Sequence, residues 1–413
     1  MNLFKKYFLL IIAGTLLLSC GQTNDKNSPK GYPLILISID GFRWDYFDKT
    51  DTPHFDELIA GGVKAESLIP VFPSKTFPNH YSIVTGLYAE NHGIVANRMY
   101  DPEFDAWFYI GENSEPVSES RWWEGEPIWV TVEKQNKIAA CMFWPGSEAE
   151  IQGVRPTYWR TYDHDLPKED RISQVLAWLD MKEEDRPDFI TLYFSDTDSW
   201  GHDYGPDAVE MAEVIEEIDE SMGALLDSLE VRNLKDKINI IVVSDHGMTE
   251  LSRERVVFLD DYINLDDVLF VDYSPVAALR PNDEMEDSIY LSLVNAHSNM
   301  NVYLKEEIPE RLHYRNHRRI TPIICFADDG WSITDHSYYD SYPDAFTGGT
   351  HGYDPVYDSM HGICIAYGPA FNNGITVPSI KIIHLYSLMA QVMNLQPAET
   401  DGSLDSVTVF LAR

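Results

Sequence analysis

The apolar residues of this chain gather in short runs that end in acidic or other polar residues. Four such runs occupy residues 33–39, 188–194, 238–244 and 364–367. Strands that are apolar along their whole length are typical of a parallel sheet that helices cover on both faces. We therefore predict an α/β fold with a central, mostly parallel sheet.

Helical patterns lie between these runs. Thr52 is followed by Pro53, a residue that suits the first position of a helix, and Gly61 can end that helix. Between residues 207 and 229, apolar residues recur at helical spacing and form one stripe. We expect this stripe to pack into the core, with helices on both faces of the sheet.

The chain after residue 30 contains no proline-rich linker, repeat or low-complexity break, which predicts one domain over residues 31–413. Two segments, about 95–165 and 250–345, are richer in aromatic residues and turns, and we interpret them as insertions that cap a site. The second contains the basic segment 315–319, which we expect to be a solvated or salt-bridged loop rather than a phosphate clamp.

The N-terminal residues are typical of an export signal. Two lysines precede an apolar run over residues 8–18, which is too short to span a bilayer comfortably. The run ends in Leu17-Leu18-Ser19-Cys20, which resembles a bacterial lipobox with Cys20 as the lipidated residue. We predict a signal peptide over 1–19 and a lipidated tether over 20–30, on the periplasmic or outer-surface face of a bacterial envelope. The alternative is an ordinary cleaved signal in which Cys20 is incidental.

Acidic residues dominate the charge: 67 Asp and Glu residues outnumber 31 Lys and Arg residues, for a formal net charge of −36. Such a surface repels polyanions at long range, which argues against binding to duplex nucleic acid. A small anionic substrate is compatible with it where metal cations dominate locally. The remaining cysteines, Cys141, Cys325 and Cys364, lie in apolar runs and are too few for a disulfide scaffold, so we expect buried free thiols.

Carboxylate and imidazole residues follow the ends of the predicted strands. Asp40 ends the first run, and Asp245 and His246 end the third; we call these three the first ligand set. Ligands of open α/β sheets bind beyond the carboxyl ends of the strands, so we expect these side chains to meet. Mixed carboxylate and imidazole ligands suit Zn²⁺, which takes about four ligands. The Thr76 hydroxyl, just before a predicted helix, would be the fourth.

A second ligand set comprises Asp198, His202 and His351. Asp198 and His202 are four residues apart, so one helical turn brings both to one face. His351 lies in a glycine-rich loop, and His361 is an alternative third ligand. Two zinc ions about 4 Å apart can hold the attacking and leaving oxygens of a phosphoryl displacement. A threonine hydroxyl such as that of Thr76 is a poor nucleophile at neutral pH and requires such activation.

These motifs together resemble the nucleotide pyrophosphatase/phosphodiesterase family of the alkaline phosphatase superfamily. The resemblance spans the chain after the N-terminal segment, and the segment around Thr76 is highly specific. The matching segments are 39–43, 72–80, 84–88, 91–94, 244–248, 351–354 and 367–369. The resemblance implies an alkaline-phosphatase-like α/β fold with inserted cap segments.

The resemblance further implies a two-zinc enzyme in which Thr76 is the covalent nucleophile. The ion in the first ligand set would lower the pKa of the Thr76 hydroxyl. The ion in the second would stabilise the leaving oxygen and then activate the water that hydrolyses a phospho-threonine intermediate. Asn97 would donate to a non-bridging phosphoryl oxygen, beside the Thr76 backbone N–H at a helix N-terminus.

The resemblance also suggests how a nucleotide would bind. The rings of Phe77 and Tyr162 would sandwich the base, and three more residues match nucleotide-pocket positions, namely Trp144, Ser147 and Tyr193. Because 12% of the residues are aromatic, ordinary packing is the alternative for each ring. Relatives usually carry Glu-Glu-Pro-Asp-Ser-Ser-Gly-His where residues 195–202 read Ser-Asp-Thr-Asp-Ser-Trp-Gly-His, so the ligands are kept while Ser195 and Trp200 alter their surroundings.

We therefore predict a lipid-anchored two-zinc phosphodiesterase that hydrolyses nucleotide phosphodiester or pyrophosphate bonds to a nucleoside 5′-monophosphate. One alternative is a choline-head-group or lysophospholipid phosphodiesterase on the same metal core, since some members of the family use such substrates. Another is a catalytically silent surface-binding lipoprotein. The physiological substrate, the oligomeric state and the metal loaded in the cell stay open.

Overall fold

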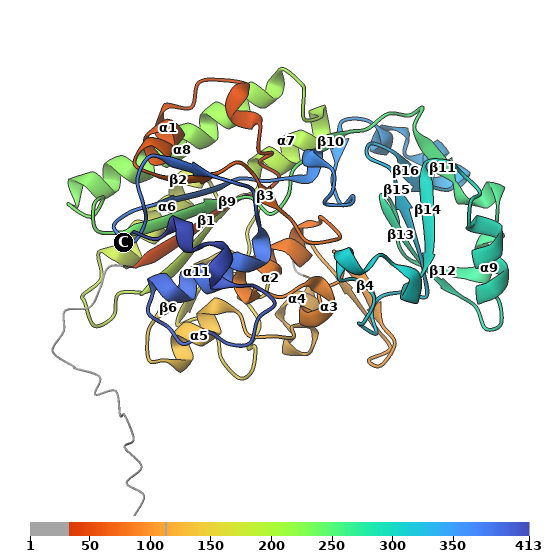
Figure 1. Cartoon of the computed structure of the whole chain (residues 1–413), viewed down its shortest axis with the longest axis horizontal. Coiled ribbons are helices and arrows are strands. Elements are labelled where there is room, and N and C mark those ends of the chain that lie inside the picture. The colour runs from red at the N-terminus through yellow and green to blue at the C-terminus, as the bar shows by residue number, and fades with distance from the viewer. Residues whose placement is uncertain (1–32, 112–113, 413) are drawn as a thin grey trace, which may run out of the picture. The chain divides into compact units, whose positions relative to one another are not determined.

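A computed structural model describes residues 33–111 and 114–412 of the chain (Figure 1). The predicted signal peptide, the tether and Cys20 lie outside these residues and stay predictions. A mixed eight-stranded sheet forms the centre, in the order β19-β2-β18-β9-β1-β8-β6-β7. Its strands are β1 (Leu34–Ile39), β2 (Gly62–Ala65), β6 (Ala139–Met142), β7 (Tyr158–Trp159), β8 (Phe189–Phe194), β9 (Asn239–Val243), β18 (Cys364–Tyr367) and β19 (Ile375–Val377).

The predicted α/β class with a mostly parallel sheet is confirmed, and one central strand, β18, runs antiparallel to its neighbours. Strands β6, β8, β1 and β9 pair in parallel, whereas β18 is antiparallel to both β9 and β2. Parallel neighbours require a crossover that returns the chain to the opposite end of the sheet. The chain between β9 and β18 instead returns at the same end of the sheet at which it left, because the Ser244 N–H, just after β9, donates to the Ile363 carbonyl, just before β18. Strand β18 therefore starts where β9 ends.

Helices cover both faces of this sheet, because successive residues of each buried strand point to opposite sides. Ile35 and Ile37 of β1 pack with α1 (Pro53–Ala60), α6 (Lys168–Leu179) and α8 (Glu210–Val231). Leu34 and Leu36 pack with α2 (Thr76–Thr85), α5 (Ile128–Lys134) and α11 (Leu385–Val392). Figure 1 shows α1 and α8 on one side of the sheet and α2, α5 and α11 on the other. The predicted stripe of the 207–229 segment is buried along α8, except for Val209, which precedes the helix and is 83% exposed.

The segment after β9 builds a second sheet with its own apolar core (Figure 1). This sheet has the order β12-β13-β15-β14 and is antiparallel throughout. Its elements are β12 (Val268–Asp272), β13 (Val276–Pro281), α9 (Glu286–Leu293), β14 (Met300–Leu304) and β15 (Ile323–Ala327), and nearby lie the paired β11 (Val256–Phe258) and β16 (Ser332–Thr334). The role of this segment as a cap insertion stays a prediction.

The other short elements connect these layers. The hairpin of β4 (Arg98–Asp101) and β5 (Ala106–Tyr109) packs beside β12. The remaining ones are β3 (Leu68–Ile69), α3 (Ala89–His92), α4 (Glu115–Ser118), α7 (Asp196–Tyr204), β10 (Thr249–Glu250), α10 (His336–Ser341), β17 (Gly349–Thr350) and β20 (Ile380–Lys381). In the part of the chain that the structure describes, no helix is both long and apolar enough to cross a membrane.

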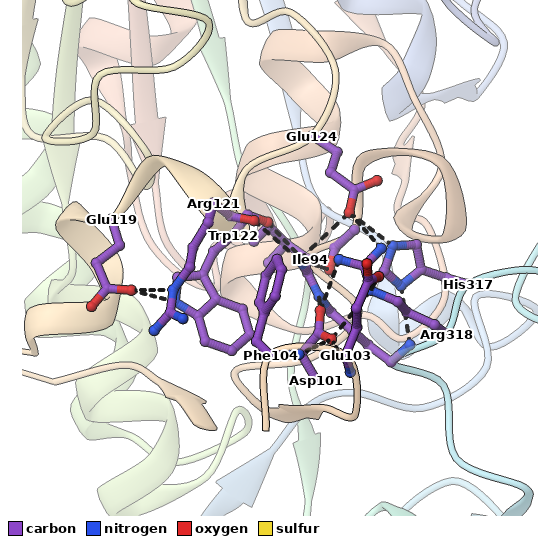
Figure 2. A network of polar contacts seen from close by, with 12 residues as sticks. Ile94, Asp101, Glu103, Phe104, Glu119, Arg121, Trp122, Glu124, His317 and Arg318 are labelled. Carbon is purple, nitrogen blue, oxygen red and sulfur yellow. Dashed lines mark hydrogen bonds and ion pairs between the residues drawn. The ribbon is translucent and has the colours of Figure 1, made fainter. Parts of the chain in front are cut away.

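The basic segment 315–319 is joined to acidic residues of the segment 95–165 (Figure 2). Arg319 is 1% exposed, and its Nε donates to Asp101 Oδ2 at 2.7 Å. Arg318 contacts both Asp101 and Glu124, and the His317 ring lies 3.2 Å from Glu124. The prediction of a salt-bridged loop is confirmed, although the solvated alternative is wrong for Arg319.

The three thiols Cys141, Cys325 and Cys364 are free and buried, as predicted. Burial raises the pKa of the Cys325 and Cys364 thiols to about 12, so both stay protonated at neutral pH. They therefore pack as small apolar side chains.

Candidate active site

The candidate site lies at the carboxyl ends of three neighbouring strands of the central sheet. Asp40 directly follows β1, Asp245 lies two residues after β9, and α7, which carries Asp198, begins two residues after β8. The parallel pairing of β1 with β8 and with β9 brings these ends together. The structure therefore places the predicted carboxylates at the edge of the sheet where α/β folds bind ligands.

The first ligand set forms a compact buried group. The ligand atoms of Asp40, Asp245 and His246 all lie within 4.8 Å of one another. His246 Nε2 is 3.3 Å from Asp40 Oδ1 and 3.0 Å from Asp245 Oδ2. The other ring nitrogen, Nδ1, lies 2.8 Å from the Gly247 carbonyl oxygen. A hydrogen bond from Nδ1 to this carbonyl orients Nε2 toward the two carboxylates.

The second ligand set has the same construction. His202 Nε2 and His351 Nε2 lie 3.5 and 3.6 Å from Asp198 Oδ1. Their Nδ1 atoms lie 2.9 Å from the carbonyl oxygens of Gly349 and Ser74 respectively. The loop before His351 approaches α7 closely: a Cβ on Gly348, whose φ is +69°, would lie 2.0 Å from the His202 carbonyl oxygen. A glycine is therefore required there.

The donor atoms of both sets fit a metal ion. Asp40 Oδ1, Asp245 Oδ2 and Asp198 Oδ1 are buried and accept no hydrogen bond from any residue that the structure describes. Buried carboxylate oxygens without a donor are unfavourable, and here they converge with imidazole nitrogens. A divalent cation in each set would satisfy them, and mixed carboxylate and imidazole ligands match the chemistry of Zn²⁺.

The electrostatics of the first set agree with this fit. Burial, followed by the charges of Asp245 and Asp198, raises the pKa of Asp40 well above its usual range. Burial lowers the pKa of His246, but the neighbouring Asp245 carboxylate outweighs it and the net value rises to about 9. A proton and a cation therefore compete for His246 Nε2. In the second set, burial lowers the pKa of His351 well below its usual range, and the nearby His246 and His202 lower it further. His351 is therefore in the neutral form, which is the form that binds metals.

Thr76 is the first residue of α2, and its Oγ1 lies 3.3 Å from His246 Nε2. The turn before the helix is tightly held: the Asn79 side chain donates to the carbonyls of Pro73 and Lys75, and the Ser74 hydroxyl donates to the Tyr353 carbonyl. Backbone N–H groups of a first helical turn have no acceptor within the helix. The nucleophile candidate thus sits rigidly at a positive helix end beside the first ligand set.

Asn97 lies beside the start of the same helix. Its Oδ1 accepts a hydrogen bond from the Phe77 N–H at 3.0 Å, which assigns the orientation of the amide. The Nδ2 group is then left to donate toward a ligand next to Thr76. This is the placement that a donor to a phosphoryl oxygen requires.

A cavity of about 280 Å³ opens beside Thr76. Asp40, Thr76 and Asp198 line it together with Phe77, Tyr162 and Trp144. A cavity with apolar and aromatic walls and a few polar groups is typical of a small-molecule site. The structure thus brings both predicted base-contacting rings into one cavity with the nucleophile candidate.

Two other predicted pocket residues have different surroundings. Tyr193 lines the cavity, but the residue is only 9% exposed and its hydroxyl donates to Asp40 Oδ2 at 2.7 Å, so it orients a candidate metal ligand. Ser147 is fully buried, its hydroxyl donates to the Trp144 carbonyl, and it is not among the cavity-lining residues. The side chain of Ser147 closes a turn in this structure, and its assignment to the nucleotide pocket stays a prediction.

The alternative metal ligand His361 lies outside both sets. Its Nδ1 bonds with the Ser67 hydroxyl and its Nε2 with the Pro355 carbonyl, so both nitrogens are engaged elsewhere. His80 and His92 likewise hold local structure, through the Thr76 carbonyl and the Ser82 hydroxyl respectively.

Sequence reasoning missed two residues that shape the cavity. Glu148 lines it and accepts a hydrogen bond from the Tyr162 N–H at 3.0 Å. Arg171 of α6 is 3% exposed and donates to the carbonyls of Leu166, His164 and Tyr193. It thereby holds the loop after Tyr162 against β8. Neither residue lies in a motif, because each acts through contacts between distant segments.

Comparison with known proteins agrees with this geometry. The family model described as type I phosphodiesterase / nucleotide pyrophosphatase matches residues 34–354. Ectonucleotide pyrophosphatase/phosphodiesterase family member 5 of Homo sapiens is 39% identical over 384 residues, which cover 93% of this chain and 79% of that protein. The bis(5′-adenosyl)-triphosphatase of Xenopus laevis is 37% identical over 413 residues, covering 99% of this chain and 88% of that protein.

Solved structures show the same fold. Murine ectonucleotide pyrophosphatase/phosphodiesterase 5 superimposes with a TM-score of 0.88 at 40% identity, covering 92% of this chain and all of that one. An inactive threonine-to-alanine variant of the murine protein, in complex with AMP, superimposes with a TM-score of 0.88 at 39% identity.

Proposed function

Because the chain belongs to the type I phosphodiesterase / nucleotide pyrophosphatase family, a family of hydrolases, we propose that it cleaves nucleotide phosphodiester or pyrophosphate bonds and releases a nucleoside 5′-monophosphate. One observation carries the proposal: Thr76 lies beside the first ligand set and lines the same cavity as Phe77 and Tyr162. A phosphoryl group at Thr76 would therefore have its nucleoside directed into an aromatic-walled cavity.

We assign the two ligand sets to Zn²⁺. Two such ions would supply Lewis-acid chemistry, lowering the pKa of a hydroxyl or water and stabilising negative charge on phosphoryl and leaving oxygens. The protein's part is to hold the ligands, and it does so through the Nδ1–carbonyl contacts of His202, His246 and His351. Tyr193 supports Asp40 in the same way.

Thr76 would act as the nucleophile. Its Oγ1 attacks phosphorus, and the bond from phosphorus to the leaving oxygen breaks as the Thr76–phosphorus bond forms. Water then cleaves this phospho-threonine, which releases the nucleoside 5′-monophosphate and regenerates the hydroxyl. Asn97 Nδ2 and the Thr76 N–H would donate to a non-bridging oxygen as charge develops on it. The nucleobase would lie between Phe77 and Tyr162, where stacking on aromatic faces is favourable.

The test compares the purified protein with its Thr76→Ala and Thr76→Ser variants on three p-nitrophenyl esters, those of thymidine 5′-monophosphate, phosphate and phosphocholine. We expect the nucleotide diester to be preferred, Thr76→Ala and a chelator to abolish its turnover, and Thr76→Ser to retain part of it. Elemental analysis should find two zinc ions per chain. Turnover that survives Thr76→Ala would disprove the covalent mechanism. A preference for the phosphocholine ester would keep the mechanism and overturn the substrate in favour of the choline-head-group alternative.

We also propose that the protein is exported and anchored through lipid on Cys20, based on the lysines, apolar run and lipobox-like residues of the N-terminal segment. Detergent phase partitioning of the full chain tests this. The wild-type protein should enter the detergent phase, and Cys20→Ala should move it to the aqueous phase. Equal partitioning of the two would exclude the anchor.

A further inference from the structure

The turn that carries Thr76 contacts both candidate ligand sets. On one side, the Ser74 carbonyl oxygen lies 2.9 Å from Nδ1 of His351, a member of the second set. On the other, Thr76 Oγ1 lies 3.3 Å from Nε2 of His246, a member of the first set. Lys75 lies between Ser74 and Thr76 in the chain. A displacement of Lys75 would therefore move the nucleophile candidate relative to both sets.

The side chain of Lys75 contacts the second sheet. Its Nζ forms an ion pair with Oδ2 of Asp272, the last residue of β12, and the two side chains are 9% and 17% exposed. Asp272 Oδ1 accepts a hydrogen bond from the Tyr273 N–H at 3.0 Å, which orients the carboxylate. Among the residues that the structure describes, Lys75 forms no other ion pair. Because a buried ammonium group requires a charged partner, this pair fixes the turn to the end of β12.

A second contact joins the end of β12 to Asn97. Arg98, the next residue in the chain, donates from Nη1 to the Val271 carbonyl oxygen at 2.5 Å, and the strand β4, which begins at Arg98, packs beside β12. Asn97 in turn accepts a hydrogen bond from the Phe77 N–H at 3.0 Å. The last two residues of β12 therefore hold the residue before the candidate nucleophile and the residue after the candidate phosphoryl donor.

From this arrangement we propose that Asp272 is a positioning residue for the attack on phosphorus: through Lys75 it holds Thr76 in line with the phosphoryl group. The inference rests on the proposed function, in which Thr76 is the nucleophile. Asp272 is not among the residues that line the 280 Å³ cavity. It therefore acts on the reaction through Lys75 rather than through contact with a substrate.

The expected effect is on the chemical step rather than on substrate binding. A displacement of about 1 Å can slow a reaction roughly 100-fold, because the attacking atom must be aligned with the bond that breaks. Burial of a base against Phe77 and Tyr162 has no such requirement, since the hydrophobic effect is non-directional. Loss of the ion pair should therefore lower kcat by roughly 10- to 100-fold and change the KM of a nucleotide ester by less than about threefold.

The experiment is a double-mutant cycle on the p-nitrophenyl ester of thymidine 5′-monophosphate, with Asp272→Leu, Lys75→Met and the variant that carries both. Each single variant leaves one buried charge without its partner and is expected to lose stability. The double variant removes both charges and keeps side chains of similar size, so its melting temperature should be close to that of the wild type. Its kcat should nevertheless be as low as that of either single variant, because all three lack the same ion pair.

Two controls accompany the cycle. Asp266→Asn removes an exposed carboxylate that lies two residues before β12, and it should leave kcat and KM unchanged. Zinc content, measured by elemental analysis, should be the same in the wild type and the double variant, because neither Asp272 nor Lys75 is a candidate ligand. The loss of kcat then reflects the position of Thr76 rather than the loss of an ion.

Several results would overturn the positioning role. A double variant with the kcat of the wild type would do so, as would losses of kcat that multiply between the two single variants. Less bound zinc in the double variant, or a rise in KM that accounts for the whole loss of kcat/KM, would exclude it as well. These results would leave the proposed function intact, whereas a wild-type protein that does not cleave the ester would overturn the proposed function and the positioning role with it.

Discussion

The buried carboxylate of Asp101 offers a quantitative test of how the segment 95–165 is joined to the basic segment 315–319. Burial alone would raise its pKa, but hydrogen bonds from Arg319 and Arg318 outweigh burial and lower the pKa from 3.8 to about 2. Glu103 and Phe104 also donate their N–H groups to its Oδ1. A decrease of roughly two pKa units corresponds to at most about 2.5 kcal/mol, and because Arg318 is partly exposed we expect about 2 kcal/mol.

The sign of the pH dependence follows from the lowered pKa. Because the folded protein binds the Asp101 proton more weakly than the unfolded chain does, the stabilisation is complete above about pH 4. It is lost as the pH falls toward 2, where the folded carboxyl is protonated. Asp101→Asn removes the charge at every pH. The difference in unfolding free energy between wild type and variant should therefore be about 2 kcal/mol at pH 7 and shrink steadily below pH 4.

Urea unfolding followed by tryptophan fluorescence, at several pH values between 7 and 2.5, measures this difference. Glu103→Gln is the matched control: it is the same kind of substitution in the same loop, but the Glu103 side chain is 70% exposed where it pairs with Arg318. We expect a change below about 0.5 kcal/mol for it. A difference for Asp101→Asn that is as large at pH 3 as at pH 7 would refute the assignment to charge pairing, as would a negligible difference at pH 7.

Three shorter predictions concern the site itself. Tyr193→Phe removes the donor to Asp40, and we expect kcat to fall about 10-fold with little change in the KM for nucleotides, because the hydroxyl orients a ligand rather than the base. Arg171→Met should instead raise the KM for nucleotide diesters more than that for p-nitrophenyl phosphate, since it loosens the loop after Tyr162. Chelation should lower the melting temperature, and excess Zn²⁺ at 100 times its Kd should restore about 2.7 kcal/mol of stability for each of the two proposed ions.

The grouping of the two candidate ligand sets could be predicted from sequence because their residues are tied to strand and helix ends. Asp40 and Asp245 lie within two residues of apolar strands, and parallel strands bring such residues to one edge. Asp198 and His202 share one face of a helix through their spacing alone. In the first case the rule that parallel strands align their carboxyl ends was enough, and in the second the rule that residues four apart share a helix face.

Features that depend on long-range packing were beyond such reasoning. The direction of β18 depends on the end of the sheet at which the chain returns after the segment between β9 and β18. A short apolar run is compatible with a parallel or an antiparallel strand, so the sequence does not distinguish the two. The burial of Arg319 likewise depends on Asp101, which lies 218 residues away in the sequence. Ser147 matches a nucleotide-pocket position of the family by its place in the sequence. The direction of its hydroxyl depends on the local turn, in which it donates to the Trp144 carbonyl.

The same distinction explains why the substrate is harder to infer than the reaction. The reacting groups occupy strand and helix ends of the central sheet, where small changes in position would break the ligand geometry. The walls of the cavity come partly from loops: Tyr162 lines it from a loop, and Glu148 accepts a hydrogen bond from the Tyr162 N–H. Loops tolerate substitution, so one metal core can serve different leaving groups. Substrate preference should therefore respond to changes at Phe77 and Tyr162 while the dependence on Thr76 stays constant, and a variant series scored on both quantities would show the separation directly.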